Sequence, residues 1–280
     1  MQSHPWVLVG CGYTGTRLAR ALVGQGADVT VTRRDRAALE TLAGQLGVRG
    51  VRVDLAMPST LLGVIPPDAI VVVLAPPGDD PAREIGGVID ASRDAHRLVY
   101  VSSTGVYAPG GGAVVDEAWP LAPVTESGQR RLAAESALAD AEVPAVVLRV
   151  AGIHGPSRGL VDRIRDGTYR IVGDGTAHVS RIHVDDLVAA IIAAGQSDVT
   201  GAINIADDDP APIGEVADTI ARTLGVAAPP RVAPDSVSPE VAGMLLADRR
   251  IANARMKREL GVTLRYPSWR ALISGGGAAG

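Results

Sequence analysis

The stretch Val7–Leu22, VLVGCGYTGTRLARAL, decides the fold. It opens with an apolar run typical of a buried strand and ends in a helical pattern, with Gly10, Gly12 and Gly15 in G-x-G-x-x-G spacing between them. In this setting Gly10 permits a sharp turn, Gly12 lets the backbone approach a pyrophosphate, and Gly15 allows the helix to pack closely on the strand. The stretch therefore predicts a dinucleotide-binding turn, with the phosphates at the amino end of the helix.

The segments that follow alternate between short apolar runs and helical patterns. Strands are expected at Trp6–Val9, Asp28–Thr32, Gly50–Asp54, Ala69–Leu74, Arg97–Ser102 and Ala145–Val150. Helices are expected at Thr14–Gln25, Asp35–Leu46, Pro81–Asp94 and Glu126–Ala139. Most of the runs are continuously apolar, which suits strands covered on both faces. The alternation predicts an α/β protein with a doubly wound parallel sheet, that is, a Rossmann fold.

The regular alternation of strands and helices ends after Val150. Turn-rich segments and shorter elements follow. Elements are expected at His183–Ala194, Ala202–Ile205, Ile213–Leu224, Pro239–Leu246 and Asn253–Leu260. We expect residues 1–150 and 177–205 to form the dinucleotide-binding domain, and residues 151–176 and 206–273 to form a smaller substrate-binding region. The Gly- and Ala-rich tail, residues 274–280, is expected to be flexible.

The composition excludes several classes of protein. The chain of 280 residues is 46% hydrophobic and 21% charged, as in globular proteins. Its net charge of -4, its aromatic content of 3% and its lack of Phe argue against nucleic-acid binding. The single cysteine, Cys11, cannot form a disulfide within the chain and fits a cytoplasmic protein. No apolar run is long enough to span a membrane, and neither a leader segment nor a metal site is expected.

The end of the second expected strand indicates which dinucleotide binds. NAD sites usually place a carboxylate there for the ribose 2′-hydroxyl, but this strand ends Thr32-Arg33-Arg34, with Asp35 displaced behind the arginines. Because guanidinium groups match a 2′-phosphate, the pattern favours NADP(H). One of the two arginines can equally be a solvated loop charge.

Further cofactor contacts are expected at the carboxyl ends of the other strands. Asp54, after the third strand, either caps the next turn or, with Leu55, borders the adenine. The remaining expected contacts are Tyr13 and Thr14 in the glycine-rich turn, Ala75, Pro76 and Pro77 after the fourth strand, and Ser102 on the fifth. The two prolines would form a stiff wall without backbone donors.

Several ordered segments of the chain resemble one known family. Val101–Tyr107 is similar to an SS-x-x-VYG segment, Leu148–Pro156 to an LR…YGP turn, Arg181–Asp186 to an IHVDD helix start, and Asn253–Trp269 to an N…LGW…YPS ending. Together they resemble the extended short-chain dehydrogenases/reductases of the NAD-dependent epimerase/dehydratase type. The resemblance implies a Rossmann fold, a nicotinamide cofactor, and oxidoreductase or epimerase activity on a small molecule.

The sequence departs from that family at its acid/base pair. The family carries Y-G-x-S-K-L-x-x-E, in which the tyrosine passes a proton and the lysine holds the nicotinamide ribose. Here the corresponding run is Ser127–Glu135, with Ser127 at the tyrosine position and Arg131 at the lysine position. A serine hydroxyl is a poor general acid, whereas Arg131 can still bind ribose but does not give up its proton.

Other groups are candidates to complete the chemistry. Ser103 matches the family's catalytic Ser/Thr position and can polarise a carbonyl. Tyr107 and His154 are candidate proton donors, although each can equally be a structural residue of its turn. His183 is expected to cap the helix that follows it.

Three functions are compatible with these residues. The first is an NADP(H)-dependent oxidoreductase or epimerase with a non-standard acid/base, acting on a small polar metabolite such as a carbonyl compound or a sugar nucleotide. The second is an NADP(H)-binding sensor or regulatory protein without turnover, and the third is a non-redox lyase or cyclase on the same fold. The family resemblance also implies a homodimer through Pro81–Asp94 and Glu126–Ala139, whose apolar residues can equally face the core.

Overall fold

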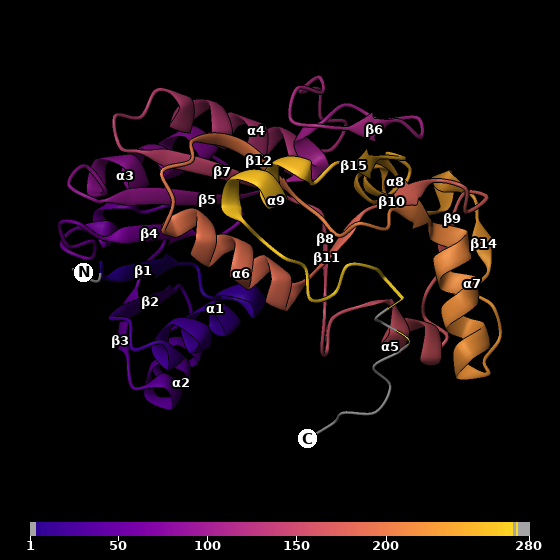
Figure 1. Ribbon diagram of the computed structural model, residues 1–280, viewed down its shortest axis with the longest axis horizontal. Helices are drawn as coiled ribbons and strands as arrows, with labels where there is room; N and C mark the ends of the chain where they lie inside the picture. Colours follow the sequence, from indigo (N-terminus) through magenta and orange to yellow (C-terminus); the bar gives the residue numbers. More distant parts are fainter. Residues whose placement is uncertain (1–3, 271–272, 274–280) are drawn as a thin grey trace.

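A seven-stranded parallel sheet forms the centre of the molecule (Figure 1). The computed structural model describes residues 4–270 and residue 273, so the expected tail, residues 274–280, lies outside the described residues. The strand order is β12-β7-β5-β4-β1-β2-β3. The strands are β1 (Trp6–Val9), β2 (Val29–Arg33), β3 (Arg49–Arg52), β4 (Ile70–Val73), β5 (Arg97–Ser103), β7 (Ala145–Val150) and β12 (Gly201–Ile205).

The strand order places a topological switch point beside β1. The chain moves outward from β1 through β2 to β3, then returns to the other side of β1 and continues through β4, β5, β7 and β12. Ligands of doubly wound sheets bind at such a switch point, outside the carboxyl ends of the strands. All residues of β1 and β4 are buried, as expected for strands covered on both faces. The predicted Rossmann fold is confirmed.

Helices cover both faces of the sheet. The core on one face includes residues of α1 (Tyr13–Gly24), α2 (Arg36–Leu46), α6 (Val184–Gly195) and α9 (Ala254–Leu260). The core on the other face includes residues of α3 (Pro81–Ala91) and α4 (Glu126–Ala139), which pack on each other. Among the described residues, no helix has both the length and the apolar character needed to cross a membrane.

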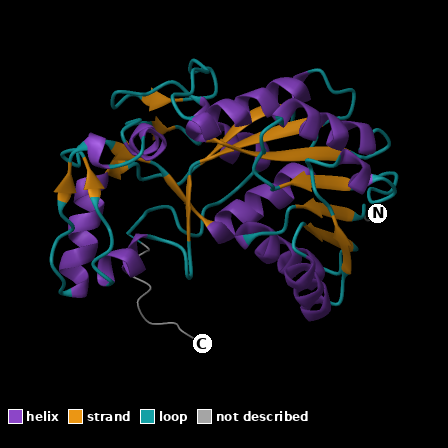
Figure 2. Ribbon diagram, turned by 180° about the vertical axis from the view of Figure 1, so that it is seen from behind, coloured by secondary structure: helices purple, strands orange, loops and turns teal. Residues whose placement is uncertain are grey.

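A smaller lobe lies beyond the carboxyl edge of the sheet (Figure 2). The paired strands β8 (Gly152–His154) and β11 (Arg181–His183) connect it to the sheet. Its apolar cluster joins residues of α5 (Leu160–Arg165) and α7 (Ile213–Leu224) to Trp269. The remaining elements are β6 (Val114–Val115), β9 (Ile171–Val172), β10 (His178–Val179), β13 (Ala211–Pro212), β14 (Arg231–Val232), α8 (Pro239–Leu245), β15 (Arg250–Ile251) and the short 3₁₀ helices Pro58–Leu61, Thr104–Val106 and Pro234–Ser236.

Most expected elements lie within a few residues of their predicted bounds. The helix expected over Pro81–Asp94 ends at Ala91, because Ser92 closes its last turn by donating its N–H to Ile89. His183 caps α6 as expected, since its side chain accepts from the Asp185 N–H. Helix α9, which was expected within the smaller region, packs instead on β12 and α6.

The end of α6 makes a close approach to the sheet that only glycine allows. A Cβ on Gly195 would lie 2.5 Å from Cη2 of the buried Trp6 ring and 3.0 Å from Ile70 Cγ2. We therefore expect Gly195→Ala to lower the free energy of unfolding by about 1–3 kcal/mol, since a packed core resists extra volume.

Urea denaturation of the full chain measures this effect. Gly86→Ala in α3 is the matched control, because a Cβ there meets no atom within 4 Å. The control should instead raise stability, by up to about 1 kcal/mol, from helix propensity alone. Equal effects of the two substitutions would contradict the packing argument.

Candidate functional site

The glycine-rich turn joins β1 to α1 in the geometry that its sequence predicts. Gly10 has φ +88°, and a Cβ on it would lie 2.6 Å from Ala75 Cβ, so this position requires glycine. The Gly10 N–H donates to Thr32 Oγ1 at 3.1 Å. A Cβ on Gly12 would meet no atom within 4 Å, which leaves its backbone open to a ligand. A Cβ on Gly15 would lie 3.1 Å from Leu74 Cδ1, in keeping with a helix-packing role.

A cavity of about 800 Å³ opens in front of this turn. It lies at the carboxyl ends of β1, β2, β3 and β4, where a doubly wound sheet binds its ligand. Ten of the expected cofactor contacts line it: Gly10, Gly12, Tyr13, Arg33, Arg34, Asp54, Leu55, Ala75, Pro76 and Pro77. The size and the lining of this cavity fit a dinucleotide.

The arginines at the end of β2 have different surroundings. The Arg33 guanidinium donates from Nη2 to Thr16 Oγ1 at 3.1 Å, and its buried Nε has no hydrogen-bond partner. The Arg34 side chain is exposed and lines the cavity. Asp35 caps α2, because its Oδ1 accepts from the Ala38 N–H at 2.7 Å. One oxygen of the Asp35 carboxylate is therefore engaged in the cap, although Asp35 also lines the cavity.

Tyr13 connects the turn to the loop after β8. Its hydroxyl donates to the Pro156 carbonyl at 2.9 Å, and a Cβ on Gly155 would lie 2.7 Å from that hydroxyl. The Arg17 guanidinium lies over the Tyr13 ring, 3.8 Å from its centroid, and Arg17 also lines the cavity. The loop at Gly155 and Pro156 thus closes over the amino end of α1.

Four expected cofactor contacts do not line the cavity, and one of them, Arg131, lines the adjoining pocket described below. Thr14 and Gly15 are buried within α1, whose first turn presents Tyr13 instead. Ser102 is buried on β5 and donates to the Glu135 carboxylate of α4. Its side chain therefore faces the helix layer rather than the cavity.

A second, smaller pocket adjoins the first. It has a volume of about 210 Å³ and shares Pro76 and Pro77 with the dinucleotide cavity. The rest of its lining is Glu126, Ser127, Arg130, Arg131 and Glu240. The residues at the family's tyrosine and lysine positions, Ser127 and Arg131, therefore lie side by side in a pocket beside the cofactor cavity.

A carboxylate from the distant helix α8 occupies the amino end of α4. Glu240 accepts from the Ser127 hydroxyl and, at 2.8 Å, from the Glu126 N–H. The hydrogen bond from Ser127 lowers the pKa of the Glu240 carboxyl, so this group is ionised at neutral pH. Sequence reasoning missed Glu240 because 113 residues separate it from Ser127 and no motif marks it.

Arg131 lines this pocket, whereas Ser103, on a turn that packs against α4, lines neither pocket. Arg131 Nη1 donates to the Val101 carbonyl at 3.0 Å, which orients its guanidinium beside β5. Ser103 Oγ accepts from the Gly105 N–H at 3.0 Å and keeps its own hydrogen to donate. A Cβ on Gly105 would lie 4.0 Å from Gly128 Cα, so the turn of Ser103 packs against the turn of α4 that carries Ser127.

Tyr107 belongs to a buried polar network. Its hydroxyl donates to Asn204 Oδ1 at 2.7 Å and accepts from Arg149 Nη1 at 3.1 Å. Arg149 also forms an ion pair with Glu135 at 2.8 Å, with both side chains buried. Burial raises the pKa of the Tyr107 hydroxyl. This arrangement matches the structural alternative for Tyr107, since it lines neither pocket.

His154 is buried at the end of β8. Neither ring nitrogen has a hydrogen-bond partner, and the ring of His183 lies edge-on at 5.2 Å between centroids. Burial, with smaller contributions from His183 and Arg181, lowers the pKa of His154 to about 4. The imidazole is therefore neutral at pH 7, and it lines neither pocket.

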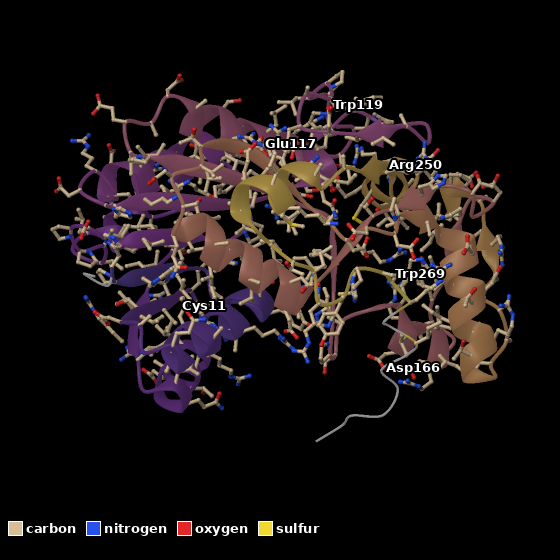
Figure 3. All side chains as sticks on the ribbon, viewed as in Figure 1. Cys11, Glu117, Trp119, Asp166, Arg250 and Trp269 are labelled. Carbon is tan, nitrogen blue, oxygen red and sulfur yellow. The ribbon has the colours of Figure 1, made fainter. Side chains whose placement is uncertain are left out.

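Two further residues illustrate what the site excludes and what sequence reasoning missed (Figure 3). Cys11, labelled beside α1, is buried, and burial raises the pKa of its thiol to about 11, so the thiol is not a nucleophile. Glu84 of α3 lines the dinucleotide cavity and accepts from the Gly78 N–H at 2.7 Å. Nothing in the local sequence distinguishes Glu84 from other carboxylates in the first turn of a helix.

The family model described as the NAD dependent epimerase/dehydratase family matches residues 6–206. The chain belongs to this family. It is 34% identical over 202 residues to a 3-diazoavenalumate denitrifying reductase of a Streptomyces species. The match covers 65% of this chain and 66% of that reductase, so the chain spans just under two thirds of the length of this relative. It is 31% identical over 260 residues to a 2-alkyl-3-oxoalkanoate reductase of Stenotrophomonas maltophilia, covering 80% of this chain and 75% of the relative.

Solved structures agree with this family assignment. A protein of unknown function from Silicibacter pomeroyi superposes with a TM-score of 0.83 at 30% identity, and the match covers 97% of each chain. The enzyme WbmG of Bordetella bronchiseptica, solved with NAD and UDP, shares the fold with a TM-score of 0.79 at 20% identity, over 98% of this chain and 94% of that one. The family model and the solved structures therefore agree in placing the chain in the epimerase/dehydratase family.

The buried His154 should make stability depend on pH. Its pKa in the folded state, about 4, lies below the usual value of 6.5, so only the unfolded chain takes up a proton between these values. This contribution to stability is complete above pH 6.5 and is lost as the pH falls toward 4. The loss approaches about 1.4 kcal/mol per pH unit.

Comparison of wild type with His154→Leu isolates this effect. Asp207, whose pKa burial raises to about 7, has the opposite dependence and is present in both proteins. Urea denaturation at pH 7.0, 6.0 and 5.0 should show that the variant loses less stability on acidification. Parallel pH profiles would show that His154 is not responsible.

Proposed function

We propose that this protein is an NADP(H)-dependent oxidoreductase or epimerase that acts on a small polar metabolite bearing a carbonyl group. The main support for this proposal is the place where the two pockets adjoin. A dinucleotide-sized cavity meets, at Pro76 and Pro77, a pocket that presents Ser127 and Arg131. The names of both curated relatives, which are reductases, support the same reaction class.

The end of β2 supports NADP(H) over NAD(H). A 2′-phosphate would meet the exposed guanidinium of Arg34, beside Arg33, which also lines the cavity. Asp35, the carboxylate that could hold a free 2′-hydroxyl, is engaged as the cap of α2. The NAD in the WbmG structure supports a nicotinamide dinucleotide in general, and the arginines support the phosphorylated form.

Arg34→Ala tests this preference. The variant should bind NADPH about tenfold to a hundredfold more weakly, because one charge-assisted hydrogen bond is lost, while its Kd for NADH stays unchanged. Arg36→Ala is the matched control, since Arg36 pairs with Glu40 outside the cavity. Titration of intrinsic or NADPH fluorescence measures both constants. Equal weakening for NADPH and NADH would contradict the assignment.

In this proposal, side chains of the protein bind the carbonyl oxygen of the substrate and stabilise the negative charge that develops on it. When bound, NADPH provides the hydride that the carbonyl carbon accepts. The hydroxyl of Ser127, which now donates to Glu240, would donate to the carbonyl oxygen. The Arg131 guanidinium would stabilise the developing negative charge without giving up its proton.

The proton in this proposal comes from water. Tyr107 and His154 line neither pocket, and Glu240 is ionised at neutral pH. The alcohol oxygen would therefore be protonated from solvent that enters beside α4. A water-dependent protonation step is slower than transfer from a positioned tyrosine, so we expect modest turnover.

Ser127→Ala tests the chemical step. The substitution should lower kcat about tenfold or more and leave the Kd for NADPH unchanged, because it removes one donor to the reacting oxygen. The matched control is Ser136→Ala on the same helix, whose exposed hydroxyl donates to the Leu132 carbonyl at 3.0 Å. Mass spectrometry of deuterium transfer from labelled NADPH to a panel of ketones and keto acids provides the measurement.

A second candidate, an NADP(H)-binding sensor without turnover, is favoured by the burial of Tyr107 and His154. It predicts NADPH binding without deuterium transfer to any carbonyl compound, together with a protein partner. Transfer to a single metabolite would exclude it. A cytoplasmic location and a homodimer through α3 and α4 remain part of the proposal.

A further inference from the structure

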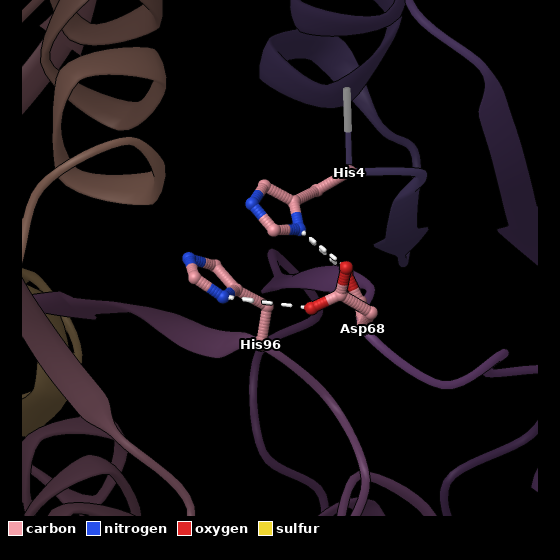
Figure 4. Close-up of side chains that lie close together, drawn as sticks. All are labelled: His4, Asp68 and His96. Carbon is pink, nitrogen blue, oxygen red and sulfur yellow. Dashed lines mark hydrogen bonds and ion pairs between the residues drawn. The ribbon is translucent and has the colours of Figure 1, made fainter. Parts of the chain in front are cut away.

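Three potential metal ligands meet at the amino edge of the sheet, opposite the dinucleotide cavity (Figure 4). His4 precedes β1, Asp68 precedes β4 and His96 precedes β5. Because β4 lies between β1 and β5 in a parallel sheet, the amino ends of these three strands adjoin. The fold therefore brings together side chains that are distant in the sequence.

Both imidazoles present the same ring nitrogen to one carboxylate. His4 Nδ1 lies 3.0 Å from Asp68 Oδ2, and His96 Nδ1 lies 3.7 Å from Asp68 Oδ1. The two rings are stacked, with centroids 3.7 Å apart and planes inclined by 15°. One ligand atom from each residue lies within 4.8 Å of the other two.

The backbone around these side chains is held by the sheet. The Asp68 N–H donates to the Asp94 carbonyl at 2.7 Å, and the Ile70 N–H donates to the Pro5 carbonyl at 2.8 Å. Asp68 has φ +62°, an unusual conformation for a residue other than glycine. These main-chain contacts place Asp68 so that its carboxylate faces Nδ1 of both imidazoles.

We propose that His4, Asp68 and His96 bind a divalent transition-metal ion of the Zn²⁺ type. Imidazole and carboxylate are the ligands that such ions take together. Ligand atoms placed about 2.0–2.2 Å from a tetrahedral ion lie about 3.3–3.6 Å from one another. The distances of 3.0 and 3.7 Å run to different oxygens of Asp68, and one ligand atom from each residue lies within 4.8 Å of the other two, so side-chain rotations must shorten the longer separations to bring all three ligands onto one ion.

The ion would keep a coordination position open to solvent. Three protein ligands converge among the residues that the structure describes, and the Asp68 and His96 side chains are 58% and 40% exposed. Both histidines also line a cavity of about 760 Å³ together with Trp6 and Gln25. A site with three protein ligands and solvent access exchanges its ion, unlike a closed structural site. Bound metal would tie the segment before β1 to the ends of β4 and β5.

Zinc titration of the full chain, first stripped with a chelator, tests the proposal. Calorimetry should show one saturable site, and Zn²⁺ should raise the Tm, because it binds the folded state. Asp68→Asn and His96→Ala should each weaken Zn²⁺ binding by about tenfold or more. His178→Ala is the matched control, since His178 pairs with Asp248 at 2.9 Å and no third potential ligand joins them within the described part of the chain.

The outcomes separate this site from the dinucleotide site. All variants should bind NADPH as the wild type does, which also shows that they are folded. Absence of saturable Zn²⁺ binding, wild-type affinity in Asp68→Asn, or loss of binding in His178→Ala would overturn the proposal. If His96→Ala fails to fold, Asp68→Asn, which keeps the shape of the side chain, decides the question.

Discussion

The contact between the backbone at Gly10 and Ala75 is the constraint on which the site depends. It brings the ends of β1 and β4 so close together that a Cβ on Gly10 would lie 2.6 Å from Ala75 Cβ. A positive φ at Gly10 then turns the chain into α1 and aims the amino end of that helix at the cavity. The switch point between β1 and β4, the prolines that follow Ala75 and the reacting pocket beside them all depend on this approach.

The segment Ser127–Glu135 aligns with the family motif, and the residues that it retains have structural roles. Gly128 is retained, and a Cβ there would lie 2.8 Å from Pro123 Cβ. Glu135 is retained as well, and it anchors α4 through the buried ion pair with Arg149. Removal of one partner from such a pair leaves a buried charge, which is strongly destabilising. Three positions differ, Ser127, Arg130 and Arg131, and all three line the pocket beside the dinucleotide cavity.

The two edges of the parallel sheet have different chemistry. The carboxyl edge collects backbone N–H groups, arginines and the amino ends of helices, which suits an anionic dinucleotide. The amino edge carries two imidazoles and a carboxylate, which suit a cation. A parallel sheet makes both groupings because it aligns the ends of strands that are far apart in the sequence.

Sequence patterns alone predict the succession of strands and helices, the Rossmann fold and about half of the residues that line the dinucleotide cavity. Those features arise from local periodicity and from glycine spacing, which act over a few residues. Only the tertiary structure decided the surroundings of Tyr107 and His154, the contact of Glu240 with Ser127 and the meeting of His4, Asp68 and His96. Burial and contacts between distant segments depend on how the elements pack, and no local pattern records them.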